Sequence, residues 1–370
     1  MSSIGVPRLL AGPYPCGSED IGGDWLPVAL GLEEPNRHRT EVTRIGEGRG
    51  HMGSAFRVRF LCDHPDHPAP SFVVKLPAEE GPARHTAEQG GLYKREVRFF
   101  LDIAHRSPLR VPWCYAAGGA DGAGFALVLE DLDQASEVDQ VIGLDFDTAK
   151  GILLQLADFH AQWWDSADLP AMTWATRHTD EHRVSNLTGI LAAGWPRLTT
   201  ALHGRLPEGC HAAGADMAEL LPAAFRALAD EPQTLLHGDL RLDNLMFEGP
   251  NRPVAILDWQ SISRGSAAID VAYFLAQNLP ADQLRLQGEN LLEVYVQRLR
   301  ECGVERSVEQ MRRPMALAAP LTFAVASSLF VVTDASEERT RELARVMATR
   351  ALAAVELFGH PRDTIVGVRP

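Results

Sequence analysis

The chain has 370 residues, of which 45% are apolar and 23% are charged, and its formal net charge is −14. This composition excludes a disordered chain, and the net negative charge argues against a nucleic-acid partner, because phosphate backbones are bound by clustered Lys and Arg. A single hydrophobic core stops growing at about 250 to 300 residues, so the length predicts two lobes with a cleft between them.

The cysteines are five in number and far apart, which fits neither a disulfide framework nor a Cys-x-x-Cys metal site. The N-terminal residues also lack an apolar stretch long enough for a signal peptide. Both observations favour a cytoplasmic protein. The cysteines are Cys16, Cys62, Cys114, Cys210 and Cys302.

The first forty residues are rich in Gly and Pro and contain one short helical candidate, 24–30. From Thr40 the pattern changes to that of strands, with apolar and basic residues alternating over 56–60. Strands are also predicted at 42–45 and 71–76.

A helix is predicted at 93–100, where apolar residues recur three or four positions apart. Two more strand-like runs follow at 111–116 and 125–129. Together these segments predict a small antiparallel five-stranded lobe with one main helix, over residues 1–132.

From Thr148 the apolar period becomes helical, and Asp147 or Thr148 can cap this helix. Apart from short strands near Leu235 and Ala255, helical runs continue to the C-terminus. We therefore predict a larger, mainly helical lobe over residues 133–370.

The segment 314–332 has 19 residues without a charge, which approaches the length of a membrane span. It contains Pro, Ser and Thr, and its many Ala residues provide little free energy for insertion. We predict a buried helix and no membrane partner.

The most specific signal is a run in which polar residues interrupt apolar ones, Leu-Leu-His-Gly-Asp-Leu-Arg-Leu-Asp-Asn over 235–244. An Asp, an Asn five positions later and a second Asp after the next strand form the layout of a phosphoryl-transfer site. In this layout Asp239 orients or accepts the hydroxyl proton of the acceptor, and Asn244 and Asp258 bind Mg²⁺ or Mn²⁺. An Asx-rich turn between strands is the structural alternative.

Two upstream elements complete the pattern. Gly48, Gly50 and Gly53 lie between two predicted strands, where backbone N–H groups can approach phosphates, although a plain hairpin turn is the alternative. Lys75, on a predicted strand, is expected to contact the nucleotide phosphates and to be held by Glu96, on the predicted helix. A surface Lys and a solvated Glu are the alternative, but the order of the elements along the chain favours the functional interpretation.

For several other polar residues a structural role is an alternative to a functional one. Asp243 is interpreted as solvated or supporting, and Asp270 either braces the catalytic loop or caps a helix. Cys62, His64 and His67 carry metal-binding side chains within six residues, but no second cluster supplies a further ligand, so a polar hairpin tip is the simpler interpretation.

Taken in order, these residues resemble the aminoglycoside phosphotransferase and choline kinase superfamily, and within it the ecdysteroid-kinase-like branch. The similarity covers about 42–276, with 127–132 similar to the interlobe hinge and 156–161 similar to the first helix of the large lobe. The resemblance implies an α+β, protein-kinase-like bilobal fold, with ATP, or alternatively GTP, as phosphoryl donor. It also implies that the backbone from Glu130 to Leu132 contacts the purine.

Protein kinases differ from this chain after the second Asp. Here Asp258 is followed by Trp259 and Gln260 instead of Phe and Gly, and Asp270 lies only 12 positions later. This spacing leaves no room for an activation segment, which forms a platform for peptide substrates. We therefore predict ATP- and Mg²⁺-dependent phosphorylation of a hydroxylated small molecule, with a nucleotide-binding pseudokinase and a protein kinase as alternatives. Neither the acceptor nor the oligomeric state has a sequence signal.

Overall fold

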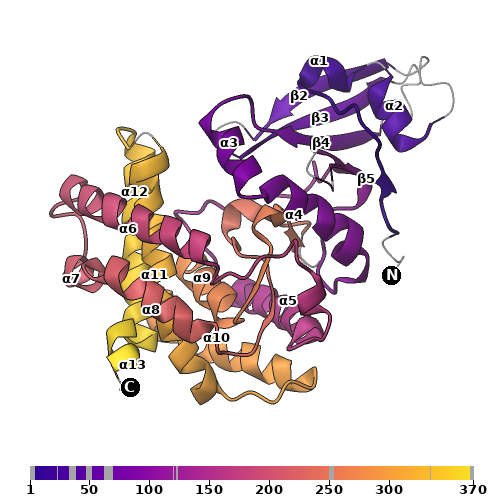
Figure 1. The fold of residues 1–370 in the computed structure, drawn as a ribbon. Helices are drawn as coiled ribbons and strands as arrows, with labels where there is room; N and C mark the ends of the chain where they lie inside the picture. Colours follow the sequence, from indigo (N-terminus) through magenta and orange to yellow (C-terminus); the bar gives the residue numbers. More distant parts are fainter. Residues whose placement is uncertain are drawn as a thin grey trace. The chain divides into compact units, whose positions relative to one another are not determined.

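The computed structural model describes residues 5–22, 24–32, 39–46, 52–61, 70–119, 121, 124–249, 254–333 and 335–366. The chain divides into two compact units (Figure 1). Unit 1 comprises Met1–Ser136 and Met246–Ile262, and unit 2 comprises Glu137–Leu245 and Ser263–Pro370. The division of the chain into domains at residue 132 stays a prediction.

Unit 1 is built on a six-stranded sheet. The five strands β2 to β6 pair antiparallel, as predicted. A sixth strand, β1, pairs parallel to β5. Strand β1 was not predicted, because it has only two residues in a segment rich in Gly and Pro. The order across the sheet is β1 (Arg8–Leu9), β5 (Cys114–Gly118), β6 (Ala126–Glu130), β4 (Ser71–Pro77), β3 (Gly53–Leu61) and β2 (Arg39–Ile45).

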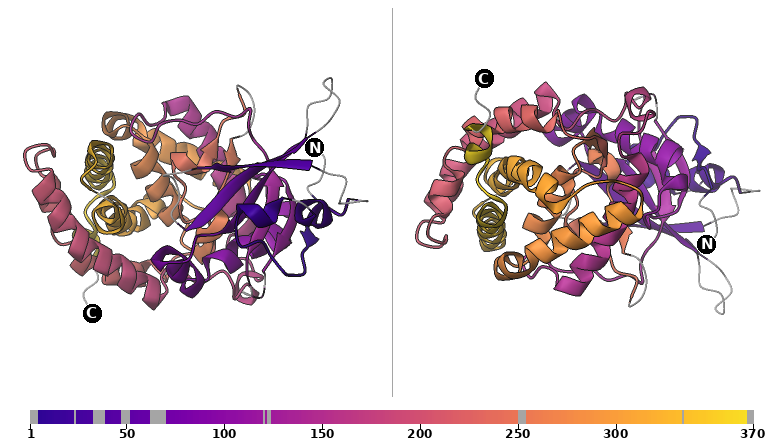
Figure 2. Two further views of the ribbon diagram at one scale, coloured as in Figure 1. Left: turned by 90° about the horizontal axis from the view of Figure 1, so that it is seen from above. Right: turned by 90° about the horizontal axis from the view of Figure 1, so that it is seen from below.

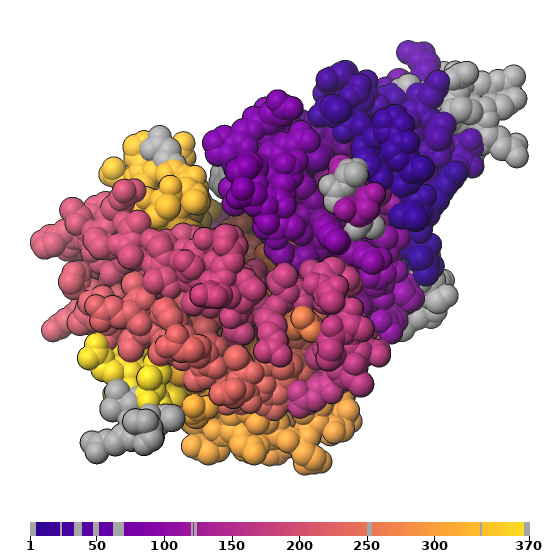
Figure 3. Space-filling view, in the orientation of Figure 1, coloured from indigo at the N-terminus to yellow at the C-terminus, as the bar shows by residue number. Residues whose placement is uncertain are grey.

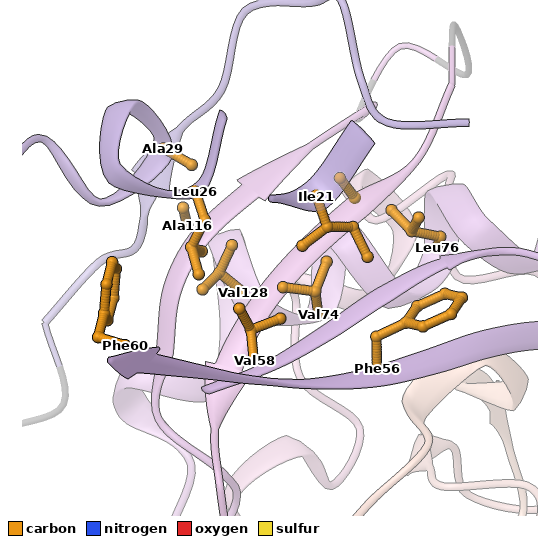
Figure 4. Packing of buried hydrophobic residues seen from close by; sticks show 11 residues of the cluster. Ile21, Leu26, Ala29, Phe56, Val58, Phe60, Val74, Leu76, Ala116 and Val128 are labelled. Atoms are coloured by element: carbon orange, nitrogen blue, oxygen red, sulfur yellow. The ribbon is translucent and has the colours of Figure 1, made fainter. Parts of the chain in front are cut away.

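One face of this sheet is covered by two short helices, α1 (Ser18–Ile21) and α2 (Trp25–Leu30). Ile21 and Leu26 from these helices pack with Val58 and Val74 of the sheet (Figure 4). Because side chains alternate along a strand, the neighbour of Val74 at position 75 points to the opposite face. That residue is Lys75, so packing of this core orients a functional candidate.

Two helices of unit 1 follow the fourth strand, α3 (Pro82–Gln89) and α4 (Leu92–Arg98). The predicted helix at 93–100 corresponds to α4 and to the π-helical turn Phe99–Ile103 that continues it. Phe99 stacks on Trp259, with ring centroids 3.8 Å apart. This contact attaches the helix to the 3₁₀ turn Trp259–Ser261, which follows the two short strands β8 (Leu245–Met246) and β9 (Ala255–Ile256).

Unit 2 is mainly helical, as predicted. Its first long helix is capped by Asp145, whose carboxylate accepts from the Thr148 amide at 2.9 Å. The expectation that Asp147 or Thr148 caps this helix was wrong, because the helix begins two residues earlier than its apolar period indicates. The helices are α5 (Phe146–Trp163), α6 (Glu181–Ala201), α7 (Cys210–Gly214), α8 (Met217–Leu228), α9 (Ala268–Asn278), α10 (Ala281–Glu301), α11 (Val308–Val332), α12 (Glu338–Phe358) and α13 (Pro361–Val366).

The apolar segment predicted as a buried helix forms most of α11. The helix starts with a capping box in which Ser307 and Gln310 bond reciprocally to each other's backbone. By length and composition α11 is apolar enough to cross a membrane, but 72% of its most apolar stretch is buried inside the structure. Figure 2 shows α11 and α12 side by side and nearly end-on, with α6 seen from the side and crossing them.

The close approach of α6 to α11 depends on one glycine. A Cβ atom at Gly194 would lie 2.4 Å from the carbonyl oxygen of Ser327, so no larger residue fits without displacing the helices. With α7 and α8, α6 covers much of the face of unit 2 that is turned to the viewer in Figure 3 (pink to salmon). Unit 2 also contains a two-stranded antiparallel sheet of β7 (Thr234–Leu236) and β10 (Ser263–Gly265), from which the polar loop after Leu236 emerges.

Candidate active site

The Lys75 ammonium lies between two carboxylates in unit 1. Its Nζ is 2.7 Å from Oε1 of Glu96, on α4, and 2.7 Å from Oδ1 of Asp258. Burial by itself would lower the pKa of Lys75, but the two carboxylates raise it overall, so the ammonium stays charged. The sequence pattern predicted the pairing with Glu96. It did not indicate the direct contact with Asp258, which is 183 positions away.

Asp258 has a backbone conformation that is rare for a residue with a side chain. Its φ of 57° lies in the left-handed region, which costs on the order of 1–3 kcal/mol unless the surroundings enforce it. Gln260 donates from Nε2 to Oδ2 of Asp258 at 2.9 Å, and Arg95 of α4 donates from Nε to the Gln260 carbonyl oxygen at 2.9 Å. These contacts hold the carboxylate toward Lys75.

Of the three glycines predicted to bind phosphate, Gly53 is among the described residues. Gly48 and Gly50 lie outside the described residues. Gly53 is the first residue of β3, where a Cβ atom would lie 3.3 Å from the Leu76 carbonyl oxygen and 3.5 Å from Cε of Lys75. A side chain at position 53 would therefore crowd the Lys75 stem.

The predicted purine-binding segment is fixed by its side chains. Both carboxylate oxygens of Glu130 accept from Arg110, at 2.9 and 3.0 Å, and Asp131 is bound through both oxygens by Arg57, at 2.7 and 3.0 Å. The paired ions orient the backbone from Glu130 to Leu132. That this backbone contacts a purine stays a prediction.

In unit 2, the carboxylate of Asp239 is held from two sides. Tyr273, on α9, donates a short hydrogen bond from its hydroxyl to Oδ1. The Asn244 amide donates from Nδ2 to Oδ2 of Asp239 at 3.2 Å and to its carbonyl oxygen at 2.8 Å. The structure thus brings together the two loop residues that the spacing predicted, and adds Tyr273, for which no loop motif gave a signal.

Asn244 has one polar atom left for another ligand. Its side chain is 5% exposed, and its Oδ1 accepts no hydrogen bond among the described residues. An amide oxygen in this state is a fitting ligand for a hard cation such as Mg²⁺.

Asp270 braces the start of this loop. It is fully buried and accepts from the amides of His237 at 2.7 Å and Gly238 at 2.9 Å. Its role is therefore loop bracing, as one of the two alternatives predicted; the N-cap of α9 is Ala267. Gly238 has a φ of 81°, so the turn that these amides form favours glycine.

A buried chain of polar groups supports Asp270. The Nε2 atom of His160, on α5, lies 3.4 Å from the Asp270 carboxylate, and Nδ1 of the same ring lies 2.7 Å from the hydroxyl of Tyr295. Burial by itself would raise the pKa of Asp270, but His160, His237 and the Gly238 amide lower it overall. The carboxylate is therefore ionised in the fold.

The two predicted metal ligands lie in different units, Asn244 in unit 2 and Asp258 in unit 1. Both offer oxygen, which suits Mg²⁺ or Mn²⁺ rather than zinc. In the described part of the chain, no group of three or more His, Cys, Asp or Glu side chains is arranged to hold a metal ion. The alternative site at Cys62, His64 and His67 lies outside the described residues.

A sequence model of the ecdysteroid kinase-like family matches residues 47–305, more than half of the chain. The chain belongs to this family. A search of curated proteins found no significant match to this ecdysteroid kinase-like chain.

Solved structures with the same fold include a protein from Ralstonia eutropha JMP134 provisionally described as an aminoglycoside phosphotransferase. It is 16% identical, with a TM-score of 0.51, and the match covers 86% of this chain and 93% of that one. Plasmodium vivax ethanolamine kinase is 10% identical with a TM-score of 0.48, covering 88% and 84% of the two chains. The aminoglycoside phosphotransferase APH(4)-Ia, solved with ADP and hygromycin B, is 15% identical with a TM-score of 0.46, covering 90% and 97%.

Two predictions are thereby confirmed for the ecdysteroid kinase-like chain. Its superfamily and branch are those that the order of motifs indicated, and its fold is the α+β, kinase-like bilobal fold. The roles assigned to individual residues stay predictions.

Proposed function

We propose that the chain is an ATP-dependent, Mg²⁺-dependent kinase that transfers the γ-phosphoryl group to a hydroxyl of a small molecule. The observation that carries this proposal is the geometry around Asp239, a carboxylate fixed by Tyr273 and Asn244 in a loop that Asp270 braces. A carboxylate held in this way can orient an acceptor hydroxyl and accept its proton. Membership of the ecdysteroid kinase-like family supports the same chemistry.

The nucleotide side of the proposal rests on unit 1. Lys75, charged and held by Glu96, is suited to bind the α and β phosphates, and the backbone of Glu130 to Leu132 to bind the purine. Mg²⁺, held by Asn244 and Asp258, would neutralise charge on the transferred group. GTP is the alternative donor.

A small-molecule acceptor is supported by the residues after Asp258. The 3₁₀ turn Trp259–Ser261, strand β10 and helix α9 follow one another directly, so no activation segment is present between Asp258 and Asp270. Nothing on this stretch offers a platform for an extended peptide. We propose a cytoplasmic enzyme whose partner is a hydroxylated small molecule, without nucleic acid or membrane.

The test is a panel of hydroxylated acceptors, read by mass spectrometry for phosphorylated product, with wild type and Asp239→Asn. Removing a positioned base lowers turnover by roughly 10²- to 10⁴-fold, while nucleotide binding persists. Asp282→Asn, an exposed carboxylate on α10, is the matched control and should retain full turnover.

Other results would point elsewhere. Nearly full turnover in Asp239→Asn removes this residue from the mechanism. Stabilisation by Mg²⁺-nucleotide without turnover on any acceptor would indicate a pseudokinase, and transfer to peptides a protein kinase.

A further inference from the structure

Arg183 brings a guanidinium to the catalytic loop of unit 2 without a carboxylate partner. It lies in the first turn of α6, and its side chain is partly buried. Among the described residues it makes no ion pair, and its one hydrogen bond runs from Nη1 to Nδ1 of His178, at 2.9 Å. Because arginine has five N–H donors and keeps its charge, most of its binding capacity is unused.

His178 determines where this guanidinium lies. The ring is buried, and its backbone N–H donates to the Arg264 carbonyl oxygen at 2.7 Å. Its Nδ1 is also 3.1 Å from the hydroxyl of Ser263, which pairs with Leu236 across β10 and β7. Leu236 leads directly into the loop that carries Asp239, so His178 fixes Arg183 at the start of that loop.

The contact between the two side chains also defines the state of His178. An arginine can only donate, so Nδ1 of His178 accepts, and the ring carries its proton on Nε2. The ring is therefore neutral. It positions Arg183 without balancing its charge.

The negative charges that act on Arg183 belong to groups with other partners. Burial lowers the pKa of Arg183, and the charges of Asp239, Asp270 and Asp180 act in the opposite direction. Asp239 is bound by the Tyr273 hydroxyl, Asp270 by backbone amides and Asp180 by the backbone amide of His182. Arg183 thus lies in their field without bonding to any of them.

Arg241, a guanidinium on the same loop as Asp239, differs in this respect. Its Nη1 lies 3.1 Å from Oδ2 of Asp243, and its Nε lies 3.6 Å from Oδ1 of Asp239. Its charge is therefore balanced within the loop. Arg183, by contrast, has no carboxylate partner among the described residues, so its guanidinium is available to a ligand.

We propose that Arg183, positioned by His178, forms a subsite for an anionic group near Asp239. A partly desolvated guanidinium binds a carboxylate or a phosphate through two parallel hydrogen bonds. The anion is either an acidic group on the acceptor molecule or the phosphoryl group in transfer. A role of this subsite in the reaction rests on the proposed function. The binding of an anion by Arg183 does not.

The first experiment measures anion binding without turnover. Inorganic phosphate is titrated by calorimetry into the full chain, in the presence of ADP and Mg²⁺ so that nucleotide-binding groups are occupied. Wild type should bind phosphate saturably, and Arg183→Met should bind it at least tenfold more weakly. Arg197→Met, which removes an exposed guanidinium from the same helix, is the matched control and should bind like wild type.

Two further variants separate binding from folding. Arg183→Lys keeps the charge but loses the two-pronged geometry, so its phosphate affinity should lie between those of wild type and Arg183→Met. His178→Phe removes the acceptor that positions the guanidinium and should also weaken phosphate binding. Equal phosphate affinity in wild type and a folded Arg183→Met, or no saturable binding in wild type, overturns the subsite.

The second experiment identifies the source of the anion. Kinetics are compared on paired acceptors that differ only in a carboxylate and its amide. If Arg183→Met lowers kcat/KM only for the acidic member of each pair, the subsite binds the acceptor. An equal fall of kcat on both members, with unchanged acceptor KM, assigns it to the transferred phosphoryl group. Unchanged kinetics on both members would refute a role of Arg183 in the reaction. Absence of turnover on every acceptor would refute the proposed function. In that case the phosphate titration still decides whether Arg183 forms an anion subsite.

Discussion

Tyr273 places a phenolic hydroxyl on the carboxylate that is proposed to act as base. Burial, followed by the charge of Asp239, raises the pKa of Tyr273 well above its ordinary value, so the hydroxyl stays protonated and donates. The contact of this hydroxyl is with the Asp239 carboxylate. We infer that it positions Asp239 for the acceptor hydroxyl.

Tyr273→Phe should therefore reduce kcat while leaving KM for nucleotide and acceptor within about twofold. A hydrogen bond to a charged group contributes about 1.5–3 kcal/mol, which corresponds to a loss of roughly ten- to hundredfold. Steady-state kinetics measure this split, with Tyr115→Phe, a partly exposed tyrosine of unit 1, as control. A less stable variant with unchanged kcat would show that Tyr273 is structural only.

Asp270→Asn should remove a stabilising contribution that depends on pH. The pKa of this carboxyl is lowered in the fold, so its contribution is present above the unfolded pKa of about 3.9 and is lost as pH falls through the lower folded value. At pH 7 the variant should lose roughly 1–3 kcal/mol, because the amide cannot replace both accepted hydrogen bonds. The difference from wild type should shrink below about pH 4.

Urea unfolding of wild type and Asp270→Asn at several pH values measures this difference. Asp282→Asn, whose side chain is exposed, serves as the control and should follow wild type throughout. A deficit of the same size at pH 7 and pH 3 would contradict a role for the ionised carboxylate.

At the scale of elements, α12 is joined to the loop 237–244, which carries Asp239, through one buried arginine. Arg350 is 1% exposed and donates from Nη1 to the carbonyl oxygens of Gln140 and Gln277, at 2.8 and 2.6 Å. The side chain of Gln140 in turn accepts from the amide of Leu242, in this loop, at 2.9 Å. Three segments far apart in the sequence are thus connected by one guanidinium.

Arg350→Met should destabilise unit 2, because the carbonyl oxygens of Gln140 and Val141 lose a donor and that of Gln277 keeps only the side-chain amide of Gln140. Each unsatisfied group costs about 1–3 kcal/mol, so we expect a loss of roughly 2–5 kcal/mol in the free energy of unfolding. Chemical denaturation measures it. Arg345→Met, which removes only a partly exposed ion pair with Glu342 on the same helix, should cost less than about 1 kcal/mol. Similar losses in the two variants would contradict the proposed connection.

At the scale of the whole molecule, nucleotide binding should raise the thermal stability of the chain. A ligand that binds only the folded state at 100 times its Kd stabilises it by about 2.7 kcal/mol. Mg²⁺-ATP should therefore raise the Tm of wild type, and the increase should largely disappear in Lys75→Met. The exposed Lys150→Met is the control. An undiminished increase in Lys75→Met would exclude Lys75 from nucleotide binding.

Local sequence patterns predicted the strands, the helices and the contacts within single loops. Alternation along strands predicted the five antiparallel strands of unit 1, and the 3.6-residue period predicted the helices, including the buried α11. The spacing of Asp239 and Asn244, which lie on one loop, was enough to bring them together. These predictions succeeded because each depends on residues close in sequence, and the two-residue strand β1 was missed because it has too few residues to show a period.

The sequence by itself therefore determined the family, the fold and the principal candidate residues. Only the tertiary structure decided their partners: Asp258 beside Lys75, Tyr273 on Asp239, and Arg183 near the same loop. Such contacts join elements whose separation along the chain is set by intervening helices and loops. Because periodicity reports only which face of an element is buried, it cannot record which distant side chain meets that face.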